Sequence, residues 1–178
     1  MNLLQRIATY GTLMALSACA PVSPYKPLNQ YLNERNQAVK VDEGEIGYAK
    51  GPIISYGFHS CVAVIFDRED EALFAHAFPS GPEYDYDGER DDYAITVNNV
   101  VTYLIRDAQS RWGSTDDVEA TVIFNKEYIE EKVLRNIEEE GIKISRIIIR
   151  EPKPRSGESV FYDPKSNFLS VIAEYSAR

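Results

Sequence analysis

The reactive residues of this sequence are one thiol and one imidazole in neighbouring apolar segments. Residues 60–67 (SCVAVIFD) and 72–78 (ALFAHAF) flank a short charged segment, a pattern that predicts a β-hairpin. A loop of two or four residues, with opposed positions summing to 137, sets Cys61 opposite His76, with Cβ atoms about 4.5–5.5 Å apart. An odd loop turns His76 to the other face. The loop length therefore decides whether the two side chains meet.

A thiol–imidazole pair is suited to nucleophilic catalysis. A neighbouring imidazolium lowers the pKa of a cysteine, and the thiolate attacks an acyl carbon while His76 passes a proton to the leaving group. A hydroxyl or carboxamide is needed to orient the imidazole. The structural alternatives are that Cys61 packs as a small hydrophobic residue and that His76 is an interior histidine. His59, beside the thiol, is either a rival base or an exposed loop residue.

The other elements predict an α+β fold, with a β core and helices on the outside. The spacing of apolar residues predicts a helix over 93–112, ended by Gly113. Asn125 is expected to cap a second helix that runs through Glu140. The remaining predicted strands are 118–124, 142–150, 159–162 and 168–173.

Composition and charge exclude several classes of protein. The 178 residues are 44% hydrophobic and 26% charged, which is typical of one globular domain and not of a disordered chain. A net charge of −9 argues against binding to nucleic acid. With two histidines and two cysteines, neither a His/Cys metal cage nor a cofactor is expected. The acidic loop at 83–92 is expected to be solvated, with a substrate-selecting rim or a weak Ca²⁺ site as alternatives.

The N-terminus has the features of an export signal. Arg6 precedes a weakly apolar stretch, and residues 16–19 (LSAC) resemble the bacterial lipobox. The resemblance implies that residues 1–18 are a lipoprotein signal peptide and that Cys19 becomes the lipidated first residue of the mature chain. The alternatives are an ordinary signal peptide and a buried apolar N-terminus.

The lipobox also sets the predicted domain boundaries. Residues 19–43 are polar and carry three prolines, and they are expected to tether residues 44–178, the folded domain, to the membrane. Ala20, the residue after the lipidated cysteine, favours the outer membrane over the inner membrane. If Cys19 carries lipid through its sulfur, Cys61 is the one free thiol of an exported protein.

The segment around the thiol resembles a known enzyme signature. Residues 54–64 (ISYGFHSCVAV) are similar to the signature of the CheD-like chemoreceptor glutamine deamidases, in which a threonine stands six residues before a Gly-Ser-Cys-Val-Ala-Val run. The resemblance covers most of the chain, from Gly44 to Val171. Further matching pieces are 44–49 (GEIGYA), 74–76 (FAH), Pro79, 93–94 (YA), 118–121 (VEAT) and 141–144 (GIKI).

The resemblance implies a fold and an activity. The fold is a β-sandwich-like α+β core with flanking helices, shared with deamidases of the cytotoxic necrotizing factor type. The activity is that of a cysteine hydrolase that converts glutamine or methyl-glutamate side chains to glutamate. Carried over by position, Cys61 is the nucleophile, His76 the acid/base and Ser55 the hydroxyl that orients the histidine. The implied partners are a protein that carries the glutamine and, through Cys19, a membrane.

Three departures from the signature bear on the substrate. His59 replaces a glycine two residues before the nucleophile, and residues 122–125 and 151–158 replace glycine-rich segments. An exported chain also cannot meet the cytoplasmic part of a chemoreceptor. The leading hypothesis is a lipid-anchored cysteine amidohydrolase. The alternatives are a non-catalytic envelope lipoprotein of the same fold that binds a protein or cell-wall partner, and a transglutaminase or peptidase with the same nucleophile.

Overall fold

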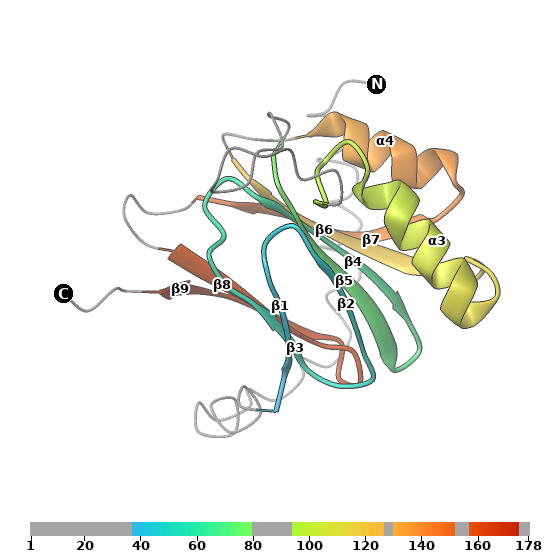
Figure 1. The fold of residues 1–178 in the computed structure, drawn as a ribbon, viewed down its shortest axis with the longest axis horizontal. Helices are drawn as coiled ribbons and strands as arrows, with labels where there is room; N and C mark the ends of the chain where they lie inside the picture. Colours follow the sequence, from blue (N-terminus) through green and yellow to red (C-terminus); the bar gives the residue numbers. More distant parts are fainter. Residues whose placement is uncertain (1–36, 80–93, 127–129, 152–156, 175–178) are drawn as a thin grey trace, which may run out of the picture.

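The computed structural model describes residues 37–79, 94–126, 130–151 and 157–174 (Figure 1). Within these ranges the chain forms nine strands and two helices. The strands are β1 (Val39–Val41), β2 (Ile46–Ala49), β3 (Ile53–Ser55), β4 (Val62–Arg68), β5 (Glu71–Ala77), β6 (Glu119–Asn125), β7 (Lys143–Arg150), β8 (Gly157–Asp163) and β9 (Phe168–Glu174). The helices are α3 (Val100–Trp112) and α4 (Glu131–Glu139). The α+β class predicted from the sequence is confirmed.

The strands form two sheets that pack face to face. One sheet has four strands in the order β1-β3-β8-β9, and the other has five in the order β2-β5-β4-β6-β7. The pairs β1–β3 and β6–β7 are parallel and the other pairs are antiparallel. Both helices lie on the five-stranded sheet, on the side away from the four-stranded sheet (Figure 1). The predicted sandwich-like core with flanking helices is therefore confirmed.

Strand β4 lies inside the five-stranded sheet and is buried on both faces. Val62 and Val64 belong to the core under the helices, whereas Cys61, Ala63 and Ile65 belong to the core between the two sheets. Because side chains alternate along a strand, this division follows from the backbone alone. Burial on both faces explains the unbroken apolar run in the sequence. The thiol consequently points into the layer between the sheets.

The β4–β5 hairpin brings the thiol and the imidazole to one face, in a register that differs from the predicted one. The loop is the two residues Glu69 and Asp70, so Ala63 pairs with His76. The even loop is confirmed, but the predicted direct pairing of Cys61 with His76 was wrong by two residues. Glu69 adopts a positive φ of 58°, which lets the chain reverse there and makes the turn as tight as a hairpin allows.

The first predicted helix starts later than its apolar spacing suggested. Residues 94–97 run beside the end of β5 instead. The Ile95 N–H donates to the Gly44 carbonyl at 2.8 Å, and the Val97 N–H donates to the Phe78 carbonyl at 3.0 Å. These bonds hold the backbone extended, and helix α3 begins only at Val100. The apolar residues of this segment indicate that it is buried, but their spacing does not indicate a helix.

The second predicted helix also begins later, and its expected cap has another role. Asn125 is the last residue of β6 and not a helix cap, while α4 begins at Glu131. The Asn125 side chain instead bonds to the loop that carries the thiol, as described below. A polar residue at the end of a buried strand thus holds another segment of the chain.

Part of the predicted tether belongs to the fold. Residues 39–41 form β1 and pair with β3, so the folded domain starts before Gly44. The predicted signal peptide, Cys19 and the acidic loop at 83–92 lie outside the described residues. Neither helix of the described part is long and apolar enough to cross a membrane.

Asp67 gives the fold a pH dependence that can be measured. Burial raises the pKa of its carboxyl group to about 6, although the Arg146 guanidinium opposes the shift. The folded state therefore holds the proton more tightly than the unfolded chain, and stability falls as the pH rises from about 4 to 6. We expect Asp67→Asn to increase the free energy of unfolding at neutral pH by about 1–2 kcal/mol.

Urea denaturation of both proteins at neutral pH and near pH 4 checks this expectation. The advantage of Asp67→Asn should largely disappear at the lower pH, where the carboxyl group is protonated in the folded state and about half protonated in the unfolded state. A difference in stability that is the same at both pH values would contradict the assigned burial of the charge.

Candidate active site

The loop that carries the thiol is fixed by side chains that bind its carbonyl groups. Cys61 lies just before β4 and is 2% exposed. Arg150 donates to the Cys61 carbonyl at 3.1 Å and to the Phe58 carbonyl at 3.3 Å. The Asn125 side-chain amide donates to the His59 carbonyl at 2.5 Å. Three carbonyl groups within four residues are thus held from outside the loop, which fixes the backbone around Cys61.

Arg150 brings a buried charge to this position, together with its counter-charge. Its guanidinium forms an ion pair with the Glu158 carboxylate, and both side chains are nearly inaccessible to solvent. Arg150 ends β7 in one sheet and Glu158 lies in β8 of the other, so the pair joins the sheets. A buried ion is tolerated only when it is paired and hydrogen-bonded. The loop carbonyls accept hydrogen bonds from the buried Arg150 guanidinium.

The imidazole is oriented by a hydrogen bond that crosses between the sheets. His76 of β5 is 0% exposed, and its Nδ1 lies 2.8 Å from Oγ of Ser55 at the end of β3. The Ser55 hydroxyl donates its hydrogen to the Val41 carbonyl at 2.6 Å. Because that hydrogen is committed, Oγ can only accept from His76, which places the ring proton on Nδ1. Nε2 keeps its lone pair, and it has no hydrogen-bond partner.

Stacking and backbone contacts complete the support of the ring. Phe58 stacks on His76 with ring centroids 3.7 Å apart and planes 10° from parallel. The Gly44 N–H donates to the His76 carbonyl at 2.8 Å. Gly44 has a φ of +82°, and a Cβ there would lie 2.6 Å from an atom of the Phe78 ring. Glycine is required at this close approach, so the segment before β2 and the histidine are positioned together.

Glu43 is a third reactive side chain at the site, and the sequence analysis did not identify it. The Cys61 thiol donates to the Glu43 carboxylate at 2.8 Å. The sulfur, a carboxylate oxygen of Glu43 and a ring nitrogen of His76 all lie within 4.8 Å of one another. Glu43 lies between β1 and β2 and is exposed, whereas its two neighbours are buried. The thiol therefore lies directly beneath a surface carboxylate.

Burial favours the neutral forms of both members of the thiol–imidazole pair. Burial raises the pKa of the Cys61 thiol, and the hydrogen bond and charge of Glu43 raise it further, while Arg150 opposes them. Burial also lowers the pKa of His76 to about 3, with the Arg150 charge adding to the shift and Asp42 opposing it. Burial therefore disfavours the thiolate–imidazolium pair that the sequence suggested. Desolvation is the largest cause of both shifts, and it disfavours the charged form of each group.

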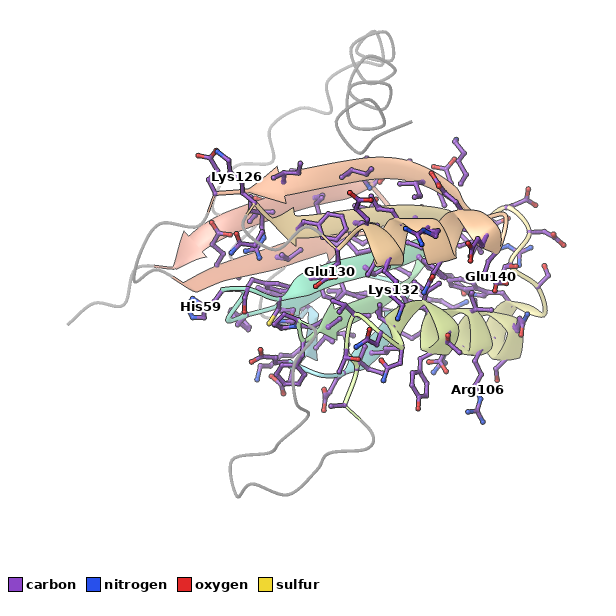
Figure 2. The ribbon with its side chains drawn as sticks, turned by 90° about the horizontal axis from the view of Figure 1, so that it is seen from above. His59, Arg106, Lys126, Glu130, Lys132 and Glu140 are labelled. Carbon is purple, nitrogen blue, oxygen red and sulfur yellow. The ribbon has the colours of Figure 1, made fainter. Side chains whose placement is uncertain are left out.

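His59 does not compete with His76 for the thiol. Its side chain is exposed and projects from the edge of the molecule (Figure 2). The group of reactive side chains around Cys61 in the described residues contains His76 and not His59. Of the two alternatives for His59, the structure supports the exposed loop residue. The three residues predicted for the site, Cys61, His76 and Ser55, are brought together.

The side chains that bind the loop carrying Cys61 lie in or beside the segments where the sequence lacks the glycines of the deamidase signature. Asn125 and Glu158 lie in the two segments that depart from the deamidase signature, and Arg150 directly precedes the second. An arginine that ends a strand of isoleucines was the one available signal, because a charge there must find a buried partner.

The comparison with known proteins does not assign a function, so the assignment depends on the geometry of the site. No protein-family model matches the chain, and no curated protein is similar to it. The site is defined by its own residues: a buried Cys–His–Ser constellation in an α+β sandwich, with an exposed glutamate over the thiol. Such an arrangement can transfer a proton between a thiol and a fixed imidazole, which is the requirement for nucleophilic catalysis.

Removal of the Ser55 hydroxyl is expected to destabilise the protein. Ser55→Ala leaves the Val41 carbonyl and the His76 Nδ1–H buried without partners, at a cost of about 2–4 kcal/mol. Ser145→Ala is the matched control, since Ser145 makes one bond to a strand carbonyl, at 3.2 Å, in a partly exposed place. Its cost should stay near about 1 kcal/mol. Equal losses in chemical denaturation would contradict the bridging role of Ser55.

Proposed function

We propose that the protein is a cysteine amidohydrolase that deamidates a glutamine side chain. Cys61 is the nucleophile, His76 the acid/base and Ser55 the orienting hydroxyl. The observation that carries the proposal is the Ser55–His76 bond of 2.8 Å, which leaves Nε2 as the free nitrogen of a ring close to the thiol. The resemblance to the CheD-like deamidases supports the same three roles.

The reaction consists of two balanced steps. In the first, the Cys61 thiol gives its proton to Nε2 while the sulfur bonds to the carboxamide carbon, and the tetrahedral intermediate collapses as His76 returns the proton to the departing nitrogen. Ammonia leaves and a thioester remains. In the second, water gives a proton to Nε2 and attacks the thioester. The carbon–sulfur bond breaks, the thiol recovers its proton, and the product is a carboxylic acid.

A neutral resting pair is compatible with this chemistry. A buried thiolate and imidazolium would need solvation that the interior does not supply, whereas a neutral thiol and imidazole need none. Charge then develops only as the substrate reacts. The Arg150 guanidinium, bonded to the Cys61 carbonyl, favours the thiolate during the attack. The fixed carbonyls of the loop hold the sulfur in place while this happens.

Glu43 favours an amide as the substrate. Its carboxylate accepts a hydrogen bond from the Cys61 thiol, and a primary carboxamide brings N–H donors that can replace that contact. The product is a carboxylate, which Glu43 would repel. The same side chain thus favours binding of glutamine over glutamate. A lipid anchor on Cys19 would limit the substrates to proteins of the bacterial envelope, with the outer membrane favoured.

The burial of the site favours a second candidate function. Cys61 is 2% exposed and His76 is 0% exposed, as expected of interior residues in a non-catalytic lipoprotein that binds a protein or cell-wall partner. Cys61→Ala separates the two functions. In a binding protein the variant keeps its partner and its effect in the cell, whereas in an enzyme the variant loses turnover.

Isotope labelling can detect the activity without a known substrate. An extract of bacterial envelope proteins is incubated with the full-length protein in H₂¹⁸O, and converted glutamines are located by mass spectrometry. Since water resolves the thioester, each new glutamate should carry one solvent oxygen. Conversion should disappear with Cys61→Ala and fall at least about a hundredfold with His76→Ala.

His59→Ala is the control for the second histidine of the chain, and it should leave the conversion unchanged. Ser55→Ala should reduce the conversion without changing which glutamines react. Conversion that persists in Cys61→Ala would contradict the proposal, as would crosslinking or chain cleavage in place of deamidation.

A further inference from the structure

Three side chains of this site form a constellation that fits a metal ion as well as a substrate. Glu43, Cys61 and His76 come from three separate segments, namely the turn after β1, the residue before β4 and strand β5. Their oxygen, sulfur and nitrogen atoms lie within 4.8 Å of one another. These donors are the ones that zinc accepts in proteins, and three protein ligands with one open position is a common arrangement.

The second observation is the state of the imidazole. His76 is 0% exposed, yet its Nε2 has no hydrogen-bond partner, which leaves a buried acceptor unsatisfied. The other ring nitrogen is held by Ser55, whose hydroxyl is itself fixed by the Val41 carbonyl. A histidine that binds a metal through one nitrogen is usually fixed through the other in this way. The ring is thus already in the tautomer of a ligand, with Nε2 unbonded.

We propose that Glu43, Cys61 and His76 bind a divalent cation of the zinc class. The Cys61 thiol loses its proton to solvent when the metal–sulfur bond forms. Nε2 of His76 and a carboxylate oxygen of Glu43 complete the protein ligands, and a fourth position remains for water. A soft thiolate selects zinc, cobalt or cadmium over magnesium and calcium.

The geometry needs adjustments of about 1 Å, because the donor atoms lie up to 4.8 Å apart and the widest pair must approach. Ligand atoms around a tetrahedral zinc lie about 3.3–3.7 Å apart, as follows from bond lengths of about 2.0–2.3 Å. The sulfur and the Glu43 oxygen are 2.8 Å apart, so they must separate by under about 1 Å. Glu43 is exposed and can move, whereas Cys61 and His76 are fixed by the contacts described above. Thiolate and carboxylate together also balance the two positive charges of the ion.

A bound metal would occupy the two atoms that catalysis requires. With sulfur and Nε2 coordinated, Cys61 cannot attack a carboxamide and His76 cannot carry its proton. The metal would therefore act as a reversible inhibitor of deamidation. This consequence rests on the proposed function, while the binding itself does not.

Cobalt provides a direct spectroscopic test. Full-length protein with Cys19→Ser keeps Cys61 as its only thiol, because the chain has two cysteines. Titration of this protein with CoCl₂ should give a thiolate-to-cobalt charge-transfer absorption and the intense visible bands of four-coordinate Co²⁺, saturating at one equivalent. Zinc chloride should bleach both signals by displacing the cobalt. Cys61→Ser should abolish the charge-transfer absorption.

Glu43→Gln tests the third ligand without disturbing the interior, since Glu43 is exposed. It should weaken cobalt binding by about tenfold or more. Glu45→Gln is the matched control two residues away and should bind as the parent does. Absence of the charge-transfer absorption in the parent would overturn the metal site, as would equal affinity in Glu43→Gln and the parent.

The two proposals can fail separately. Cobalt binding without glutamine conversion would leave the metal site and remove the hydrolase. Conversion that is insensitive to zinc, in a protein that shows no cobalt absorption, would leave the hydrolase and remove the metal site.

Discussion

The hydrogen bond between Ser55 and His76 is the contact on which the site depends. It joins the last residue of a strand in one sheet to the last residue but one of a strand in the other. Its direction is set by the Val41 carbonyl, which takes the only hydrogen that the hydroxyl can donate. The tautomer of the imidazole is thus a consequence of how the two sheets are packed. A small shift of one sheet against the other would break this bond and release Nδ1.

The interior around the thiol contains more polar contacts than a sandwich core needs. Arg150 and Glu158 form an ion pair between the sheets, and Arg150 also binds the carbonyls of Phe58 and Cys61. Buried ion pairs add little net stability compared with well-packed apolar residues. Their effect here is positional, because they fix the loop that ends at Cys61. The glycine required at Gly44 acts in the same way on the other side of His76.

Side-chain alternation made part of this arrangement predictable. An even hairpin loop was enough to place Cys61 and His76 on one face, whatever the register. The register itself depended on where the chain could adopt a positive φ, and the sequence does not mark Glu69 for that conformation. Helix α3 was predicted too long for a related reason. The first apolar residues of the predicted helix are buried because they lie beside the end of β5. Burial there selects apolar residues, as burial of a helix face would.

The residues that the sequence did not reveal act across long separations. Glu43 reaches Cys61 because β1 belongs to one sheet and β2 to the other, so that the connection passes over the thiol. Arg150 reaches the same loop from a distant strand. Neither residue has a local pattern, since its role is set by strand order and not by its neighbours in the chain. For the same reason the neutral state of the thiol–imidazole pair could not be predicted, because it follows from burial and from Glu43.

The state of the His76 ring is the most direct test of this account. Long-range ¹⁵N–¹H NMR of the imidazoles reports the charge and the protonated nitrogen of each ring, and the exposed His59 supplies a second ring in the same spectrum. Burial lowers the pKa of His76 to about 3. His76 should therefore remain neutral down to about pH 5, with its proton on Nδ1 and none on Nε2. A proton on Nε2, or a doubly protonated ring near neutral pH, would contradict the hydrogen-bond chain from Val41 through Ser55 to His76.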